Sequence, residues 1–210
     1  MANPFGELVD NDKLDEMARY VDKPKTQEDR AREAIHLQNE NNKNTNAEDY
    51  VKTVKADYGN GASTLCLIYN ATGDNLTYVT DKDWYGNIGR TPYPLEIGNG
   101  QWASFLHVHT TSASSGSEAA LVLRGKNKSG ELRDFMISWS TPWGSWYKNK
   151  AYSEMGAVDS FQGRWDDIYD KLNNSDYSDT TDRDGVQIEV DTANGSSPTF
   201  RAILKTPFSP

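Results

Sequence analysis

Cysteine and long apolar runs are scarce in this sequence of 210 residues. Its single cysteine, Cys66, excludes an intrachain disulfide, and the flanking Leu65 and Leu67 predict a buried, unreactive thiol on a strand. No stretch approaches the roughly 20 consecutive apolar residues that a membrane-spanning helix needs. The first residues also lack the basic start and apolar core of a signal peptide. We therefore expect a cytoplasmic protein of a reducing compartment.

Basic residues are in deficit as well. The chain has 22 Lys and Arg against 31 Asp and Glu, which gives a formal net charge of -9. Such a chain repels phosphate backbones and gains nothing from counterion release, so nucleic acid is not an expected partner. The deficit also removes polybasic attraction to a membrane. Aromatic insertion or capture of a specific headgroup then remains as the route to peripheral membrane contact.

Signatures of catalysis are absent too. The sequence has no Gly-x-Ser-x-Gly motif, no phosphate-binding P-loop and no dinucleotide fingerprint, so no cofactor is expected. His107 and His109 would share one face of a strand, as two metal ligands must, but no third ligand lies near them and we expect no metal. The alternative is an enzyme of specialised or stress metabolism with a pocket around these two histidines.

Residues 1–60 are polar and predict a helical segment ahead of the rest of the chain. Thr26, followed three residues later by Asp29, is typical of a helix N-terminus in which the two residues cap each other. The polar run 39–46 predicts a linker. Gly59 predicts the end of the helix that follows this linker.

Residues 61–210 change to short strands separated by turns, which is typical of a sandwich or barrel. Matched alternation predicts hairpins over 63–80, 96–109 and 119–140, a strand over 150–155, and a closing pair over 186–190 and 200–204. The acidic stretch 175–184 predicts a flexible loop. We therefore expect a mainly β fold in which this region is an antiparallel β-sandwich.

An amphipathic helix near residues 160–173 interrupts the predicted strands. Apolar side chains recur there at helical spacing, at Val158, Phe161, Trp165, Ile168 and Leu172. Their common face predicts that the helix packs against one end of the sheet.

Two segments rich in large rings follow predicted strands. Phe135, Ile137 and Trp139 share one face at strand spacing, and the other face is mostly polar apart from Met136. The pattern predicts a half-buried strand, which Pro142 ends just before the first ring-rich loop. The second loop, 81–94, is exposed by its Asp, Gly, Asn and Pro content. Rings in such loops either bind a ligand or fold back to plug the end of a sandwich, and the sequence leaves both open.

Trp and Tyr faces suit sugar CH groups, choline-type cations and the lipid interface. If the two loops converge, several rings could hold one small headgroup. The candidate binding residues are Trp84, Tyr85, Trp143, Ser145, Trp146 and Tyr147.

Five stretches of the chain are distinctive in their wording: TLCLIYNATG, DWYGNIG, NGQWASFLHVH, ALVLRGKN and DFMISWSTPWGS. Together they resemble the plant jasmonate-induced protein family of about this mass. The similarity covers nearly the whole chain. It implies a stress-induced protein, and the family carries no assigned biochemical activity.

A second resemblance covers about 64–156 and is to the aegerolysins and the actinoporin-like lectins, β-sandwich proteins that recognise sphingolipid headgroups. The PWGS sequence that begins at Pro142 matches an aegerolysin loop, and Trp84 falls where those proteins carry a lipid-contacting tryptophan. The helices predicted in 1–60 and 160–173 have no counterpart in those proteins.

Together these patterns predict a stress- or defence-related binding protein without enzymatic activity. The resemblances imply a lectin-like or lipid-binding role in which the aromatic loops recognise a glycan or a sphingolipid-type headgroup. A protein–protein interaction module is a further alternative to the enzyme. The sequence makes no prediction about oligomeric state.

Overall fold

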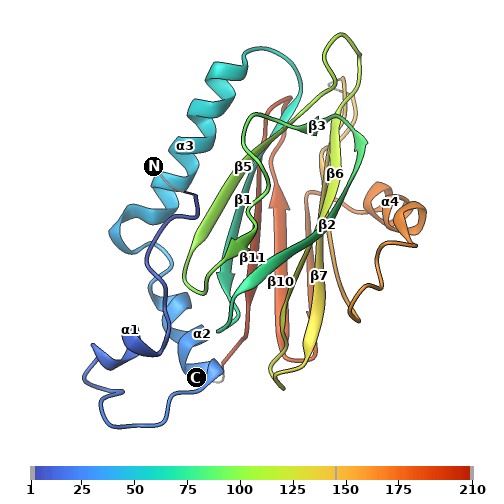
Figure 1. Cartoon of the computed structure of the whole chain (residues 1–210). Coiled ribbons are helices and arrows are strands. Elements are labelled where there is room, and N and C mark those ends of the chain that lie inside the picture. Colours follow the sequence, from blue (N-terminus) through green and yellow to red (C-terminus); the bar gives the residue numbers. More distant parts are fainter. Residues whose placement is uncertain (1–2, 145, 209–210) are drawn as a thin grey trace.

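Two stacked β-sheets form most of the computed structural model, which describes residues 3–144 and 146–208 (Figure 1). Sheet A has the strand order β3-β5-β1-β11-β10-β9, and sheet B has the order β4-β2-β6-β7-β8. The strands are β1 (Ser63–Ala71), β2 (Leu76–Tyr85), β3 (Asn87–Ile88), β4 (Glu96–Ile97), β5 (Trp102–Val108), β6 (Ser117–Lys126), β7 (Leu132–Thr141), β8 (Lys150–Gly156), β9 (Ser178–Arg183), β10 (Val186–Thr192) and β11 (Thr199–Lys205). Phe105, Trp139 and Phe200 pack together in the core between the sheets. The prediction of a mainly β sandwich is confirmed.

Helices cover the outer faces of both sheets (Figure 1). The helices α1 (Asn11–Asp15), α2 (Gln27–His36) and α3 (Lys43–Tyr58), with the short 3-10 turn η1 (Glu40–Asn42), lie on the side of sheet A, and α4 (Trp165–Asn174) lies against sheet B. The N-terminal helices and sheet A share one apolar cluster. The division of the chain into 1–60 and 61–210 stays a prediction.

The ends of two N-terminal helices follow the sequence closely. Thr26 and Asp29 form the predicted capping box at the start of α2, and Gly59, whose φ is 91°, ends α3. The linker predicted over 39–46 is wrong, because η1 and the first turn of α3 occupy it. Asn41 and Asn42 adopt left-handed φ angles of 53° and 56°, which turn the chain directly into α3.

Strand β1 explains the arrangement of sheet A, because both of its faces are buried. Cys66 and Ile68 point into the sandwich, whereas Leu65 and Leu67 pack against the N-terminal helices. A strand covered on both faces lies inside a sheet rather than in an isolated hairpin, and β1 pairs antiparallel with β5 and parallel with β11. The parallel pair departs from the expected antiparallel pattern.

Two of the three predicted hairpins are wrong. β1 and β2, expected to pair over 63–80, lie in different sheets, and so do β4 and β5 within 96–109. The chain crosses between the sheets at both turns. β1 and β5 lie in sheet A because their outer faces are apolar and pack against the N-terminal helices. The hairpin over 119–140 is confirmed by the register of β6 and β7, and the closing pair 186–190 and 200–204 by that of β10 and β11.

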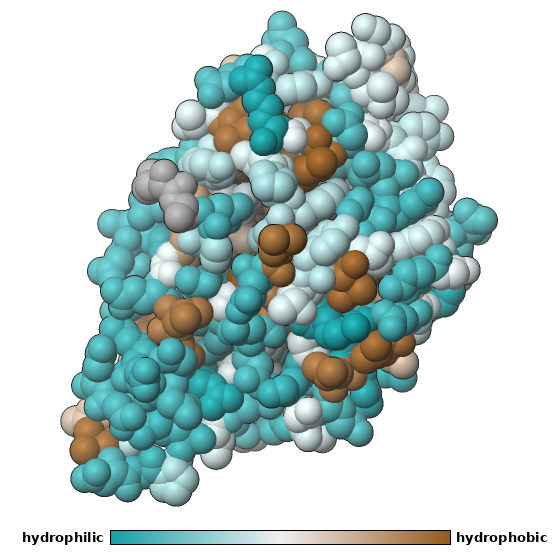
Figure 2. Space-filling view, in the orientation of Figure 1, coloured by the Kyte–Doolittle hydropathy of each residue, from teal (hydrophilic) through white to brown (hydrophobic). Residues whose placement is uncertain are grey.

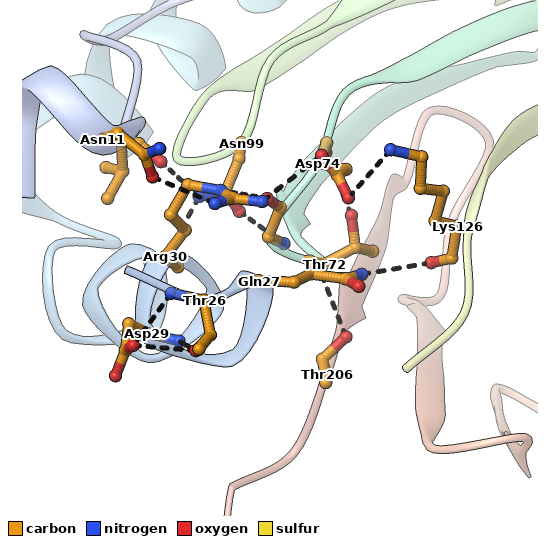
Figure 3. A network of polar contacts seen from close by, with 12 residues as sticks. Asn11, Thr26, Gln27, Asp29, Arg30, Thr72, Asp74, Asn99, Lys126 and Thr206 are labelled. Carbon is orange, nitrogen blue, oxygen red and sulfur yellow. Dashed lines mark hydrogen bonds and ion pairs between the residues drawn. The ribbon is translucent and has the colours of Figure 1, made fainter. Parts of the chain in front are cut away.

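A polar network holds the crossing between β1 and β2 in place (Figure 3). Arg30 of α2 donates from Nε to the carbonyl of Gly73 at 2.7 Å, and Gln27 donates to a carbonyl of the same turn at 2.9 Å. Asn99, in the crossing between β4 and β5, donates to the carbonyl of Arg30 at 3.0 Å. Helix α2 therefore stabilises both crossings, which explains why neither turn folds as a hairpin.

The acidic stretch 175–184 is not a loop but contains β9, so that prediction is wrong. Asp179 of β9 accepts hydrogen bonds from the backbone N–H and the hydroxyl of Ser153 at 2.9 and 3.1 Å. Ser153 belongs to β8, which confirms the strand predicted over 150–155. Asp179 thus ties the edge of sheet A to the edge of sheet B.

The predicted amphipathic helix is confirmed as α4, although its regular turns begin at Trp165. Phe161 and Ile168 are fully buried and pack on sheet B against Ala120 and Val122 of β6. Because Met136 of β7 belongs to the same cluster, β7 is buried on both faces, and the prediction that it is half-buried is wrong. This position brings α4 to the end of sheet B at which β2 finishes and β6 begins.

The surface is mostly hydrophilic in the view of Figure 2, and strongly apolar residues form separate patches on that face. In the described part of the chain, no helix combines the length and the apolar composition that crossing a membrane requires. The exposed large rings of the molecule include Tyr85, Trp143, Trp146 and Tyr147.

Candidate ligand-binding site

A β-bulge near the end of β2 turns two neighbouring aromatic residues toward α4. Asp83 and Tyr85 pair with consecutive residues of β6, so Trp84 is an extra residue in the ladder. As a result Trp84 and Tyr85 both face Tyr169 of α4, with ring centroids 5.0 and 6.4 Å from its ring. The prediction that these two residues lie in an exposed loop is wrong, because pairing with β6 keeps them in β2.

The sheet register places a row of side chains across the same face of sheet B. Tyr85 pairs with Glu118 of β6, Glu118 with Ser140 of β7, and Ser140 with Lys150 of β8. Directly opposed residues on neighbouring strands point to the same side of a sheet. Helix α4 lies over this row and brings the hydroxyl of Tyr169 to 3.2 Å from Oε2 of Glu118.

The loop after β7 completes a cavity of about 650 Å³ above this row. Trp143, Trp146 and Tyr147 line it together with Tyr85 and Tyr169. Trp146 is 85% exposed and Tyr147 is 65% exposed, which is unusual for rings of this size on a free surface. The cavity therefore has aromatic rings at its rim and the polar row at its base. We call it the aromatic cavity.

The aromatic cavity brings together four of the six predicted binding residues, namely Tyr85, Trp143, Trp146 and Tyr147. Trp84 does not line it. The ring of Trp84 is half-buried beneath α4, and its indole N–H has no hydrogen-bond partner among the described residues. Ser145 lies outside the described residues. The two ring-rich segments thus converge on one end of the sandwich, and the role of their residues in binding stays a prediction.

Trp143 separates the aromatic cavity from a neighbouring cavity of about 590 Å³. Its ring packs on the imidazole of His109, with centroids 5.4 Å apart. Nδ1 of that imidazole lies 3.0 Å from the hydroxyl of Tyr58 on α3. Gly61 approaches so closely that an added Cβ would lie 2.0 Å from the His109 ring. His109 therefore supports Trp143 from behind.

His107 lies in a buried polar network rather than in a cleft. Its Nδ1 is 2.8 Å from Oγ of Ser117, and its Nε2 is 3.0 Å from Oδ1 of Asp83. Serine, histidine and aspartate in this order also occur in hydrolases, but Ser117 and His107 are fully buried, so a substrate has no access to the hydroxyl. The network joins β5, β6 and β2, and it gives the enzyme alternative no support.

The histidines do not form a metal site with each other. His107 points into the sandwich beside Trp139, whereas His109 lies against Trp143 at the surface. Within residues 3–144 and 146–208, no three His, Cys, Asp or Glu side chains come close enough together to hold a metal ion.

Glu118 is a residue of the aromatic cavity that sequence analysis missed. It is only 6% exposed, yet it lines the cavity. Burial raises the pKa of its carboxyl, against the opposing effects of hydrogen bonds from Ser140 and Tyr169 and the charge of Lys150. The ammonium of Lys150 itself donates to the carbonyl of Asn173. Within the described residues, Glu118 forms no ion pair.

A cavity at the opposite end of the sandwich has a different character. It measures about 470 Å³ and lies beside the crossing that α2 stabilises. Arg30 and Lys126 both face Asp74 there, at 3.5 and 3.6 Å, and Arg124 bonds the buried Asp134 at 2.7 Å. Because these charges are paired with one another, a charged ligand would gain less from them than from Glu118, which forms no ion pair among the described residues.

The fold and the aromatic cavity define a class: β-sandwich proteins with helices over both sheets and exposed rings at one end. The family described as Nakanori-like protein matches residues 5–207, and the chain belongs to this family. The crystal structure of the lipid binding protein Nakanori superimposes with a TM-score of 0.88 and 26% identity, covering 96% of this chain and 99% of that one. The shared fold therefore includes the N-terminal helices.

Plant relatives agree with the first resemblance seen in the sequence. The chain is 38% identical over 189 residues to the 23 kDa jasmonate-induced protein of Hordeum vulgare, covering 88% of this chain and 89% of that protein. It is 30% identical over 113 residues to the jasmonate-induced protein homolog of Atriplex canescens, covering 52% of this chain and 60% of that protein. The resemblance to jasmonate-induced proteins is confirmed.

Proposed function

We propose that this protein binds a lipid-type ligand at a membrane surface through the aromatic cavity. The observation that carries the proposal is the convergence of Tyr85, Trp143, Trp146 and Tyr147 on one open cavity, from segments far apart in the sequence. Trp and Tyr rings are amphipathic and favour the boundary between lipid and water. Nakanori, which has the same fold, is described as a lipid binding protein, and this supports the proposal.

The arrangement suits a headgroup held at the base of the cavity while the rim contacts the bilayer. The base carries polar and charged side chains, and the rim carries the most exposed rings. The net charge of -9 opposes attraction to anionic lipids, so affinity has to come from the rings and the headgroup. A sphingolipid-type headgroup is the finer expectation. The names of the plant relatives support a stress- or defence-related role.

Co-sedimentation with vesicles tests this proposal. Wild type is mixed with phosphatidylcholine vesicles that contain or lack sphingolipid, beside Trp146→Ala and the control Leu95→Ala. Leu95 is 78% exposed but pairs through its backbone with Tyr78, far from the cavity along β2. Loss of one interfacial ring worth about 1 to 2 kcal/mol should weaken vesicle binding roughly 5- to 30-fold for Trp146→Ala and not for Leu95→Ala.

Each other outcome points to a different function. Binding to a glycan array without binding to vesicles would replace the lipid ligand by a sugar. Equal vesicle binding by wild type and Trp146→Ala would show that the exposed rings do not contribute to lipid binding. Absence of both kinds of binding would favour a protein partner for the aromatic rim.

A further inference from the structure

Glu118 places a buried carboxyl at the base of the aromatic cavity. Its side chain is 6% exposed, and within the described residues no cation pairs with it. The nearest candidate, Lys150, lies two strands away in the register and donates to the carbonyl of Asn173 instead. Removing a carboxylate from water without a partner is unfavourable, so a protein retains such a group where it has a use.

The hydrogen bonds of Glu118 also leave room for a further donor. A carboxylate offers about four acceptor positions on its two oxygens. Tyr169 donates to Oε2 at 3.2 Å, and the hydroxyl of Ser140 lies close enough to stabilise the charged form. Among the described side chains these are the donors that act on it, and the aromatic cavity lies directly in front of it.

The rings beside Glu118 favour a positive charge at the same place. Tyr85 and Tyr169 lie with their centroids 6.4 Å apart and their planes at 51°, and both line the cavity. A cation near the face of an aromatic ring is attracted by the negative electrostatic potential of that face. The carboxylate and the two rings therefore act in the same direction. The ammonium groups of Lys148 and Lys150, which also line the cavity, act against them, although Lys148 pairs with Asp176 and Lys150 donates to the carbonyl of Asn173.

We propose that the aromatic cavity takes a ligand with a primary ammonium group, and that Glu118 binds this group beside Tyr85 and Tyr169. The inference rests on the proposed function, because it names the polar end of the lipid-type ligand in the same cavity. The ligand's ammonium supplies both the counter-charge and the N–H donors that Glu118 lacks.

A quaternary ammonium fits this position less well. It has no N–H group, so it would neutralise the charge of Glu118 but leave its acceptor positions unfilled. A primary ammonium has three N–H donors, like that of lysine. Selection between the two therefore depends on the buried carboxylate, whereas attraction to the rings alone does not require a hydrogen-bond donor.

Titration with two soluble probes tests the inference without a membrane. Ethanolamine phosphate and choline phosphate are titrated into wild type, Glu118→Gln and Glu189→Gln, with heat or tryptophan fluorescence as the signal. Glu189 pairs with Lys205 at 2.8 Å on sheet A, so its substitution changes the net charge equally at a distant place. We expect ethanolamine phosphate to bind wild type about tenfold more tightly than choline phosphate, and Glu118→Gln to lose this preference while Glu189→Gln keeps it.

The inference is overturned if choline phosphate binds wild type as tightly, if neither probe binds, or if Glu118→Gln retains the preference. Glu118→Asp provides a second variant in case the glutamine variant does not fold. The aspartate side chain is one methylene shorter but keeps the carboxylate. The variant should therefore bind ethanolamine phosphate more weakly than wild type does and still prefer it to choline phosphate.

Failure of the lipid proposal has a different signature. If soluble amines bind in a way that depends on Glu118 but vesicles do not bind, the role of Glu118 is supported and the proposed binding to a membrane is wrong. Vesicle binding that depends on Trp146, without a preference for the amine, would remove only the inference.

Discussion

The hydroxyl of Tyr169 donates a hydrogen bond of 3.2 Å to the carboxylate of Glu118 and so connects α4 to the base of the aromatic cavity. Tyr169→Phe removes this donor but keeps the ring. We expect the free energy of unfolding to fall by about 1 to 2 kcal/mol, because a hydrogen bond to a buried charged group is lost. Urea denaturation at neutral pH measures the change.

Tyr177→Phe is the matched control for this substitution. The hydroxyl of Tyr177 donates to Asn194 at the surface, where water can replace it, so a change of less than about 0.5 kcal/mol is expected. Equal losses in the two variants would contradict a special role for the bond to Glu118.

Glu118 is also expected to make stability depend on pH. Burial raises the pKa of its carboxyl above the ordinary value of 4.5. The hydrogen bonds from Ser140 and Tyr169 and the charge of Lys150 lower this pKa but do not cancel the effect of burial. Tyr85 is the remaining side chain of the row that faces Glu118. The folded state holds the proton of Glu118 more tightly than the unfolded chain does. The contribution of this proton to the free energy of unfolding is therefore fully present below about pH 4.5, and it is lost as pH rises through the raised pKa.

Glu118→Gln isolates this contribution from those of other groups. The difference in free energy of unfolding between the variant and wild type should shift in favour of the variant from pH 4 to pH 7, as wild type acquires the buried charge. A difference that is constant with pH would show that Glu118 titrates as an exposed carboxyl does. A variant that is more stable at pH 7 yet binds amines less well would mark Glu118 as a residue kept for binding.

Trp84 is expected to contribute to packing rather than to ligand contact. Its ring lies with Ile168 and Phe161 beneath α4, and its N–H has no partner among the described residues. Trp84→Phe should therefore change stability by less than about 1 kcal/mol, whereas Trp84→Ala should cost about 2 to 3 kcal/mol. Vesicle sedimentation of Trp84→Phe equal to that of wild type would agree with this role. A loss comparable with that of Trp146→Ala would make Trp84 a contact residue.

Cys66 should resist thiol reagents in the native protein. It is fully buried between the sheets, and burial raises the pKa of its thiol, so little reactive thiolate forms at neutral pH. Labelling that follows denaturant-induced unfolding is the expected result. Rapid labelling under native conditions would show that the core around β1 opens.

The sequence predicted those elements whose partners are close along the chain. Alternation in β6 and β7 predicts their pairing, and the helical spacing of Phe161, Ile168 and Leu172 predicts α4, because each pattern is complete within one segment. The crossings between sheets were missed because a turn between two sheets uses the same Gly and Asn residues as a hairpin. The continuous apolar run from Leu65 to Tyr69 was the signal that β1 is covered on both faces.

The candidate site was predicted in part for a similar reason. Rings in polar segments are visible locally, so Tyr85, Trp143, Trp146 and Tyr147 were found. Glu118 and Tyr169 are 51 residues apart, and only the register of sheet B and the position of α4 bring them together. The bulge that turns Trp84 beneath the helix depends on pairing with β6, which no local pattern reveals.

Quenching of tryptophan fluorescence by brominated lipids tests the central claim most directly. Trp146 is 85% exposed at the rim of the aromatic cavity, so its ring should enter the bilayer interface when the protein binds. We predict that vesicles with brominated acyl chains quench the fluorescence of wild type. Trp146→Phe should still bind and lose the part of the quenching that comes from Trp146, whereas Trp143 at the same rim remains quenched. Vesicle binding with no quenching, or with the same quenching in Trp146→Phe, would contradict the claim that the aromatic rim contacts the lipid.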